Sequence, residues 1–336
     1  MHNYRRAALP ALISFALVGC AGMAPTQNMP PNVAKAVQPV DVNVGIKQPE
    51  LYAAFEVSAA GQAAAAGCGA IPGIGILLAA ACGGVAGAMD ASINASRAKA
   101  ADETIRPLKD QIVDMQFDQM MNNAVAGALQ NVPGMSVTSV VVTKTVEDKA
   151  YEETFRASKS NGVMFVNVDY HLTKDFSTLE VSARGLLYPR SVSARTSAGL
   201  PTDLPPAPQP ALALQNTAYR ANVFYHVKLP VKAAEPGAYI AAWQADNAVL
   251  LRNGLENGTA EVARLLSEDI QRAPEVKVAV LTKAEAAPGI TADVIAERDG
   301  GKLFRYADGS VHFHTTASAT VPVATTAAAP AGTAAQ

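Results

Sequence analysis

Residues 166–187 read VNVDYHLTKDFSTLEVSARGLL, and apolar and polar side chains alternate in two segments of this stretch. A period of two is typical of a β-strand that buries one face, because successive side chains point to opposite sides of a sheet. Residues 219–229 show the same alternation. The three strands therefore predict an antiparallel sheet, with an apolar face covered by helices and a second face that is wet or partly wet.

The second face of this sheet carries the best candidates for chemistry, which are Asp169, His171, Arg184 and His226. Asp–His pairs commonly act as general bases, so these residues could gather into a site. The alternative is a solvated polar face, and the sequence contains no nucleophile elbow, phosphate-binding loop or convincing dinucleotide fingerprint. We therefore predict no catalytic residue, no cofactor and no enzyme activity.

Helices and further strands flank these three strands along the chain. Apolar periodicity predicts a helix over about 98–130, which ends at Val132-Pro133-Gly134. The other predicted elements are an edge strand at 42–46, a strand at 137–146, a short helix at 149–158, and helices at 238–253 and 259–271, the last capped by Thr259. The expected fold class is α+β, with a mainly antiparallel sheet covered by helices and an inserted helical hairpin.

A small β-meander is predicted near the C-terminus. Two Asp-Gly dipeptides, at 299–300 and 308–309, favour hairpin turns between short strands at 294–297, 302–306 and 310–314. We interpret the meander as an appendage to the main domain. His312 and His314 lie two residues apart on its last strand and would point the same way, as a pair of metal ligands does. No third ligand is evident from the sequence, so we predict no metal site.

The inserted hairpin comes from residues 57–89, which contain no charged residue and are rich in Gly and Ala. Small residues recur at every fourth position, among them Gly75, Ala79, Gly83 and Gly87. Such a row lets helices pack closely, in lipid above all. With a break at Pro72 the segment is a hairpin that inserts part way into a bilayer or packs against copies of itself. The alternatives are one spanning helix over 71–89 and a hairpin buried within the soluble fold.

Two cysteines lie within this segment. Cys68 and Cys82 are seven residues on either side of Gly75, so a hairpin that turns near Pro72 would bring them roughly opposite each other. A disulfide could form in an oxidising compartment if the Cα atoms come within about 7 Å. Two small buried thiols are the alternative.

The N-terminus has the features of an export signal. Arg5 and Arg6 precede an apolar run that ends in Leu17-Val18-Gly19-Cys20. This sequence resembles the lipobox of bacterial lipoproteins, and the resemblance implies cleavage before Cys20 and attachment of lipid, palmitate included, to that residue. Ala21, in place of Asp, implies the outer membrane, facing the periplasm. An ordinary secretory signal with an incidental cysteine is the alternative.

The chain as a whole loosely resembles envelope lipoproteins that combine a lipobox, a glycine-rich hydrophobic segment and an α/β domain. The predicted parts are a signal peptide (1–19), a lipidated tether (20–40), an edge strand (41–56), the Gly/Ala-rich hairpin (57–97), an α/β domain (98–273), the meander (274–315) and a disordered tail (316–336). The formal net charge of −2 argues against a nucleic-acid partner.

These observations predict a non-enzymatic outer-membrane lipoprotein, anchored by lipid, whose hairpin mediates oligomerisation, membrane insertion or docking onto an envelope protein. The alternative is a periplasmic enzyme or ligand-binding domain that uses the polar sheet face. A pocket that gathers Asp169, His171 and His226 would favour the alternative, whereas a pocketless sheet covered by helices would favour the lipoprotein assembly.

Overall fold

The computed structural model describes residues 25–56, 88–207, 210–233, 235–272 and 281–318. The predicted signal peptide, the lipidation site Cys20 and the chain from residue 319 onward lie outside these residues. The same holds for the candidate disulfide and the predicted helix-packing positions, namely Cys68, Cys82, Gly75, Ala79, Gly83 and Gly87. The hairpin segment is described only from residue 88 onward, where the chain is helical.

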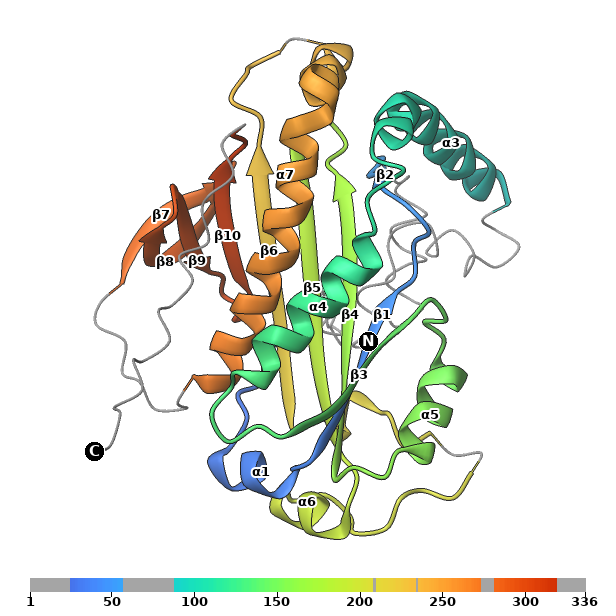
Figure 1. The fold of residues 1–336 in the computed structure, drawn as a ribbon, viewed down its shortest axis with the longest axis vertical. Helices are drawn as coiled ribbons and strands as arrows, with labels where there is room; N and C mark the ends of the chain where they lie inside the picture. The colour runs from blue at the N-terminus through green and yellow to red at the C-terminus, as the bar shows by residue number, and fades with distance from the viewer. Residues whose placement is uncertain (1–24, 57–87, 208–209, 234, 273–280, 319–336) are drawn as a thin grey trace, which may run out of the picture.

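One mixed sheet of ten strands runs through the described residues (Figure 1). Its order is β3-β1-β4-β5-β6-β10-β9-β8-β7, and β2 pairs with β4. The strands are β1 Val40–Ile46, β2 Tyr52–Ala53, β3 Val137–Thr143, β4 Gly162–Leu172, β5 Thr178–Pro189, β6 Tyr219–Lys228, β7 Thr282–Ala287, β8 Ile290–Arg298, β9 Gly301–Arg305 and β10 Val311–Thr316. The helices are α1 Pro31–Ala36, α3 Ala88–Gln111, α4 Phe117–Gln130, α5 Asp148–Ala157, α6 Val192–Ser197 and α7 Pro236–Gln271. Helices together with this sheet confirm the predicted α+β class.

The three long strands recognised in the sequence form the centre of the sheet. β4, β5 and β6 pair antiparallel, and their register places Glu180 opposite both His171 and His226. Outside this centre the sheet contains parallel pairs, because β1 runs parallel to β3 and β4 and β10 runs parallel to β6. The prediction of an edge strand at 42–46 was wrong, because β1 lies between β3 and β4.

The C-terminal meander is part of the main sheet. β7, β8, β9 and β10 pair antiparallel in chain order; the two Asp-Gly dipeptides predicted the pairing of β8, β9 and β10, but not β7. β10 then pairs in parallel with β6, and this register places His314 beside His226. The interpretation of the meander as an appendage was therefore wrong. Its last strand buries Val311 and Phe313 in the same core as the apolar face of β6.

Helices α4 and α7 cover one face of the sheet (Figure 1). The core between them is built from the apolar side of the long strands, including Val166, Val168, Leu179, Val181, Tyr225 and Val227. Gly254 and Gly258 lie one turn apart on α7 and bring its backbone directly onto β5 and β6: a Cβ at Gly258 would lie 2.6 Å from Val181 Cγ2. The apolar face predicted from the alternation is thus covered by helices.

The helix boundaries differ from the predicted ones. The helix expected over 98–130 is two helices, α3 and α4, with non-helical residues between Gln111 and Phe117. The break lets α4 turn onto the sheet, where Phe117 is buried and stacks on Tyr170. In the second half of the chain the expected break before Thr259 is absent, because Gly254 and Gly258 pack on the sheet within a continuing helix.

Helix α7 changes direction earlier, where residues 245–248 have non-helical backbone angles. Thr259 therefore does not cap a helix, and its hydroxyl donates to the carbonyl of Glu256 at 2.8 Å. Across the described ranges, no helix is both long enough and apolar enough to span a membrane.

Part of the predicted tether is folded. Met29, Val33 and Val37 recur every fourth residue around α1 and are buried in the main core. Gln27 forms a β-bridge with Arg220 of β6. From residue 27 onward the segment therefore belongs to the domain, and the apolar spacing that places it there was present in the sequence.

Candidate functional site

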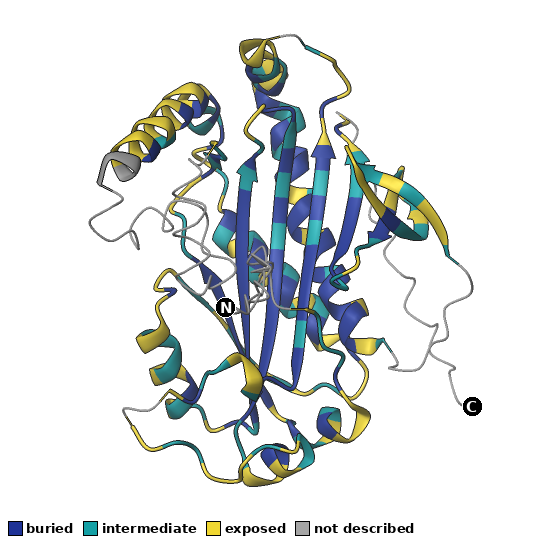
Figure 2. Cartoon of the chain, turned by 180° about the vertical axis from the view of Figure 1, so that it is seen from behind, coloured by how far each residue is buried: buried dark blue, intermediate teal, exposed yellow. Residues whose placement is uncertain are grey.

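The second face of the sheet, opposite α4 and α7, is the candidate functional surface, and it is turned toward the viewer in Figure 2. It differs in character between its two ends. At one end, the aromatic and aliphatic residues Phe155, Val163, Phe165, Leu186, Tyr188 and Ala211 form a separate hydrophobic cluster. At the other end, the ionisable side chains of β4, β5, β6 and β10 meet.

A cavity of about 670 Å³ lies at the aromatic end, between the sheet and α5. Phe165, Leu186 and Tyr188 of the sheet line it, together with Tyr151 of α5. Tyr151 stacks on Phe165 with ring centroids 4.5 Å apart. The polar residues in the wall include Asn167, Arg184, Glu152 and Arg156. Mostly apolar walls with a few polar groups are typical of a small-molecule site.

Arg184 is the predicted site residue that the fold separates from the histidines. It lies opposite Asn167 in the sheet and lines the aromatic cavity. Burial, together with the charge of Arg220, lowers the pKa of its guanidinium to about 10. The side chain therefore remains a cation at neutral pH and gives this end of the face a positive charge.

At the ionisable end, the structure joins Asp169 and His171 to two residues that the sequence analysis did not single out. The hydroxyl of Tyr52 donates to Asp169 Oδ2 at 2.8 Å, and Asp169 Oδ2 lies 2.8 Å from His171 Nδ1. His171 Nε2 lies 4.0 Å from Glu180 Oε1. Burial lowers the pKa of His171, but the hydrogen bond to Asp169 and the charge of Glu180 outweigh it and raise the pKa above its usual value.

Glu180 continues the network to the histidines of β6 and β10. Its Oε2 lies 3.3 Å from His226 Nδ1, and His226 Nε2 lies 2.9 Å from His312 Nδ1. His312 Nε2 lies 2.9 Å from the hydroxyl of Ser310, which donates to Asp308. Asp169, His171 and His226 thus belong to one network, whereas the alternative function required a pocket that gathers them.

His314 completes this end of the face. Its ring stacks on His226 with centroids 4.3 Å apart, and it forms a T-shaped pair with the Phe304 ring. Burial lowers the pKa of His312 to about 3 and that of His314 to about 4. Burial and the neighbouring histidines also lower the pKa of His226 well below its usual value. The three imidazoles are therefore neutral at physiological pH.

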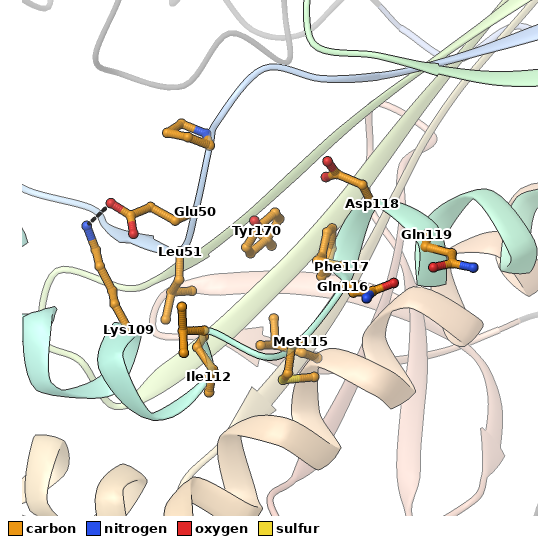
Figure 3. A pocket seen from close by; sticks show the side chains of 13 residues that line it. Glu50, Leu51, Lys109, Ile112, Met115, Gln116, Phe117, Asp118, Gln119 and Tyr170 are labelled. Atoms are coloured by element: carbon orange, nitrogen blue, oxygen red, sulfur yellow. Dashed lines mark hydrogen bonds and ion pairs between the residues drawn. The ribbon is translucent and has the colours of Figure 1, made fainter.

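A second cavity, of about 460 Å³, lies on the other side of the sheet, where α3 meets α4 (Figure 3). Ile112, Met115 and Phe117 contribute to its apolar wall. At its rim Lys109 forms an ion pair with Glu50, which ties the end of α3 to the body, and a second ion pair with Asp102 of α3 itself. Neither this cavity nor the aromatic one is lined by Asp169, His171 or His226.

The residues that the sequence analysis missed owe their place to strand order. Glu180 was visible as a polar position of its strand, but its two histidine neighbours follow from the register with β4 and β6. Tyr52 comes from the two-residue strand β2, for which the sequence gives no periodic signal. No protein-family model and no curated protein matches the chain. The chemistry of the face is therefore inferred from its geometry.

Proposed function

We propose that this chain is a lipid-anchored, non-enzymatic binding protein of the bacterial cell envelope, which holds a small apolar or amphipathic molecule in the aromatic cavity. The observation that carries the proposal is the cavity itself. Its volume of about 670 Å³ falls within the range of about 300–1,000 Å³ that is usual for ligand sites. Location at the outer membrane, facing the periplasm, rests on the lipobox ending at Cys20 and on Ala21.

The lining of the cavity suggests the class of ligand. Phe165, Leu186 and Tyr188 are each at most 8% exposed, so an apolar body placed among them would be shielded from water. Arg184 supplies a positive charge at the inner wall, while Glu152 and Arg156 form an ion pair at 2.6 Å on α5. An apolar molecule with a polar or anionic end would complement these groups.

The proposal can be tested with a fluorescent amphipathic probe, anilinonaphthalene sulfonate, and the full-length protein in detergent. We expect Leu186→Trp to fill the cavity and to weaken saturable probe binding at least tenfold. Val192→Trp, at a position of α6 that is 60% exposed, is the matched control and should bind like the wild type. Equal binding by all three proteins would refute ligand binding in this cavity.

The lipid anchor has its own test. Replacement of Cys20 by Ala should abolish metabolic labelling with palmitate and release the protein from the outer-membrane fraction. Retention of both label and location in the Cys20→Ala variant would show that the cysteine is incidental. Neither result depends on what the cavity binds.

Assembly through the Gly/Ala-rich segment is a second proposed role. It rests on the row of small residues that includes Gly75, Ala79, Gly83 and Gly87 and on the exposed position of Ala95, which continues the row on α3. Crosslinking should give oligomers for the wild type and fewer for a Gly83→Leu, Gly87→Leu variant. Identical patterns for both proteins would leave the row a feature of internal packing. The same gels, run with and without reductant, test the disulfide between Cys68 and Cys82.

A further inference from the structure

Three histidines that are far apart in the sequence come together on β6 and β10. His314 is the register partner of His226, and His312 lies two residues before it on the same face of β10. One nitrogen from each of His226, His312 and His314 can be chosen so that all three lie within 4.8 Å of one another. A cluster of imidazoles held this closely is the usual donor set for zinc, copper and nickel.

The two ring nitrogens of His226 have different partners. Nδ1 lies 3.3 Å from a Glu180 carboxylate oxygen, whereas Nε2 points at His312. In metal sites the non-ligating nitrogen of a histidine usually donates to a carboxylate or another acceptor, which fixes the ring and the tautomer. Glu180 occupies that outer position, so Nε2 is left as the ligating atom.

His312 is arranged in the same way. Its outer nitrogen, Nε2, contacts the Ser310 hydroxyl, which in turn donates to Asp308 at 2.6 Å. Its inner nitrogen, Nδ1, is the one that lies 2.9 Å from His226. Tyr306 and Phe224 stack against the ring, with centroids 3.9 and 4.2 Å away, and hold its plane. Two inner nitrogens therefore face each other, and their outer nitrogens are already anchored.

His314 offers the third donor. Its Nε2 is buried and has no hydrogen-bond partner within the described part of the chain. An unpaired buried polar atom carries a desolvation cost, which a ligand bond would remove. Zn–N bonds of about 2.0–2.1 Å place tetrahedral ligand atoms roughly 3.4 Å apart. The largest separation in the cluster, at most 4.8 Å, would shrink by at most roughly 1.4 Å, and the His226 and His312 nitrogens, now 2.9 Å apart, would move about 0.5 Å further apart to bind a metal in this geometry.

We propose that His226, His312 and His314 form a binding site for a divalent transition-metal ion, with Zn²⁺ as the reference ion and Glu180 as the outer-shell carboxylate. The site does not rest on the proposed aromatic cavity, which lies at the other end of the face. Three protein ligands leave a position of a tetrahedral ion open to water or to an external ligand.

The test is equilibrium dialysis of Zn²⁺ against full-length protein in detergent, purified without a histidine tag and treated with a chelator. We expect one tightly bound equivalent for the wild type. His314→Gln should weaken binding on the order of 100-fold or more, and Glu180→Gln about 10–100-fold, as outer-shell changes do. The same substitution at an exposed carboxylate of α5, Glu153→Gln, is the matched control for Glu180→Gln and should retain the wild-type affinity.

Two results would overturn the proposal. One is a wild type that binds no stoichiometric Zn²⁺, and the other is equal affinity in the wild type and His314→Gln. His314→Gln is chosen because its Nε2 makes no hydrogen bond in the metal-free fold, so the change removes a ligand without breaking a hydrogen bond at that atom. Circular dichroism of each variant verifies the fold, and the absorption spectrum of the Co²⁺ form of the wild type gives an independent reading of nitrogen coordination.

Discussion

The close contact of α7 with the sheet predicts that one added methyl group lowers the stability of the fold. In Gly258→Ala the new Cβ would lie 2.6 Å from Val181 Cγ2, 3.1 Å from Val181 Cβ and 3.1 Å from Tyr225 Cδ1. Rotation of the Val181 side chain cannot relieve the contact between the new Cβ and Val181 Cβ, because rotation about χ1 leaves the Cβ in place. The helix must therefore move away from β5 and β6, or the strands must bend.

The magnitude follows from two opposing terms. Overpacking a dense core costs about 1–3 kcal/mol, and the contact with a fixed Cβ favours the upper half of this range. Alanine gains about 1 kcal/mol over glycine inside a helix. We therefore expect Gly258→Ala to lower the free energy of unfolding by about 1–2 kcal/mol.

Gly127→Ala in α4 is the matched control. A Cβ at Gly127 has no atom within 4 Å, so the same substitution should raise the free energy of unfolding by about 0.5–1 kcal/mol. The assay is urea unfolding followed by circular dichroism, with equal m-values required for the comparison. If both variants were stabilised alike, the inferred distance between α7 and the sheet would be wrong.

Val181 and Tyr225 directly adjoin Glu180 and His226 in the sequence, so Gly258→Ala should also weaken Zn²⁺ binding.

Two further predictions concern stability. The pKa of His312 is about 3 in the folded metal-free protein and about 6.5 when unfolded, so its contribution is full above pH 6.5 and is lost as the pH falls towards 3. The free energy of unfolding should change by at most about 1.4 kcal/mol per pH unit through this one group. Urea unfolding of the wild type and of His312→Asn in the presence of chelator, at several pH values, should therefore show a weaker pH dependence for the variant. Parallel plots of unfolding free energy against pH would contradict the prediction. Trp243→Phe should cost about 2–3 kcal/mol in urea unfolding, because the buried indole donates to the Phe176 carbonyl at 2.8 Å, and a loss below about 0.5 kcal/mol would contradict that role.

Local periodicity predicted where the strands of this fold lie better than it predicted which strands pair with each other. The alternation over 166–187 and 219–229 located β4, β5 and β6 and assigned their apolar and polar faces, because that pattern depends only on burial. The position of β1 inside the sheet and the joining of β10 to β6 depend on parallel pairing between distant segments. No turn or local pattern encodes such a pairing, which is set by the packing of the whole core.

The candidate site shows the same division. Asp169 and His171 share a strand face, and so do His312 and His314, so each pair could be predicted from sequence. The step that joins them is the order β4-β5-β6-β10, which inserts Glu180 and His226 between the pairs. The third histidine was thus present among the predicted polar positions, but 86 residues separate it from His312 and only the parallel register brings them together.

The geometry of β5 also relates the two proposed sites to each other. Leu186 in the aromatic cavity and Glu180 beside the histidines are six residues apart on one strand, which corresponds to roughly 20 Å at about 3.3 Å per residue. Direct contact between a small molecule in the cavity and a metal ion at the histidines is therefore excluded. Buried polar side chains, Asn167 and Asn222 among them, lie on the face between the two ends. Leu186→Trp should consequently leave Zn²⁺ binding unchanged, and coupling between the sites would have to pass through the sheet itself.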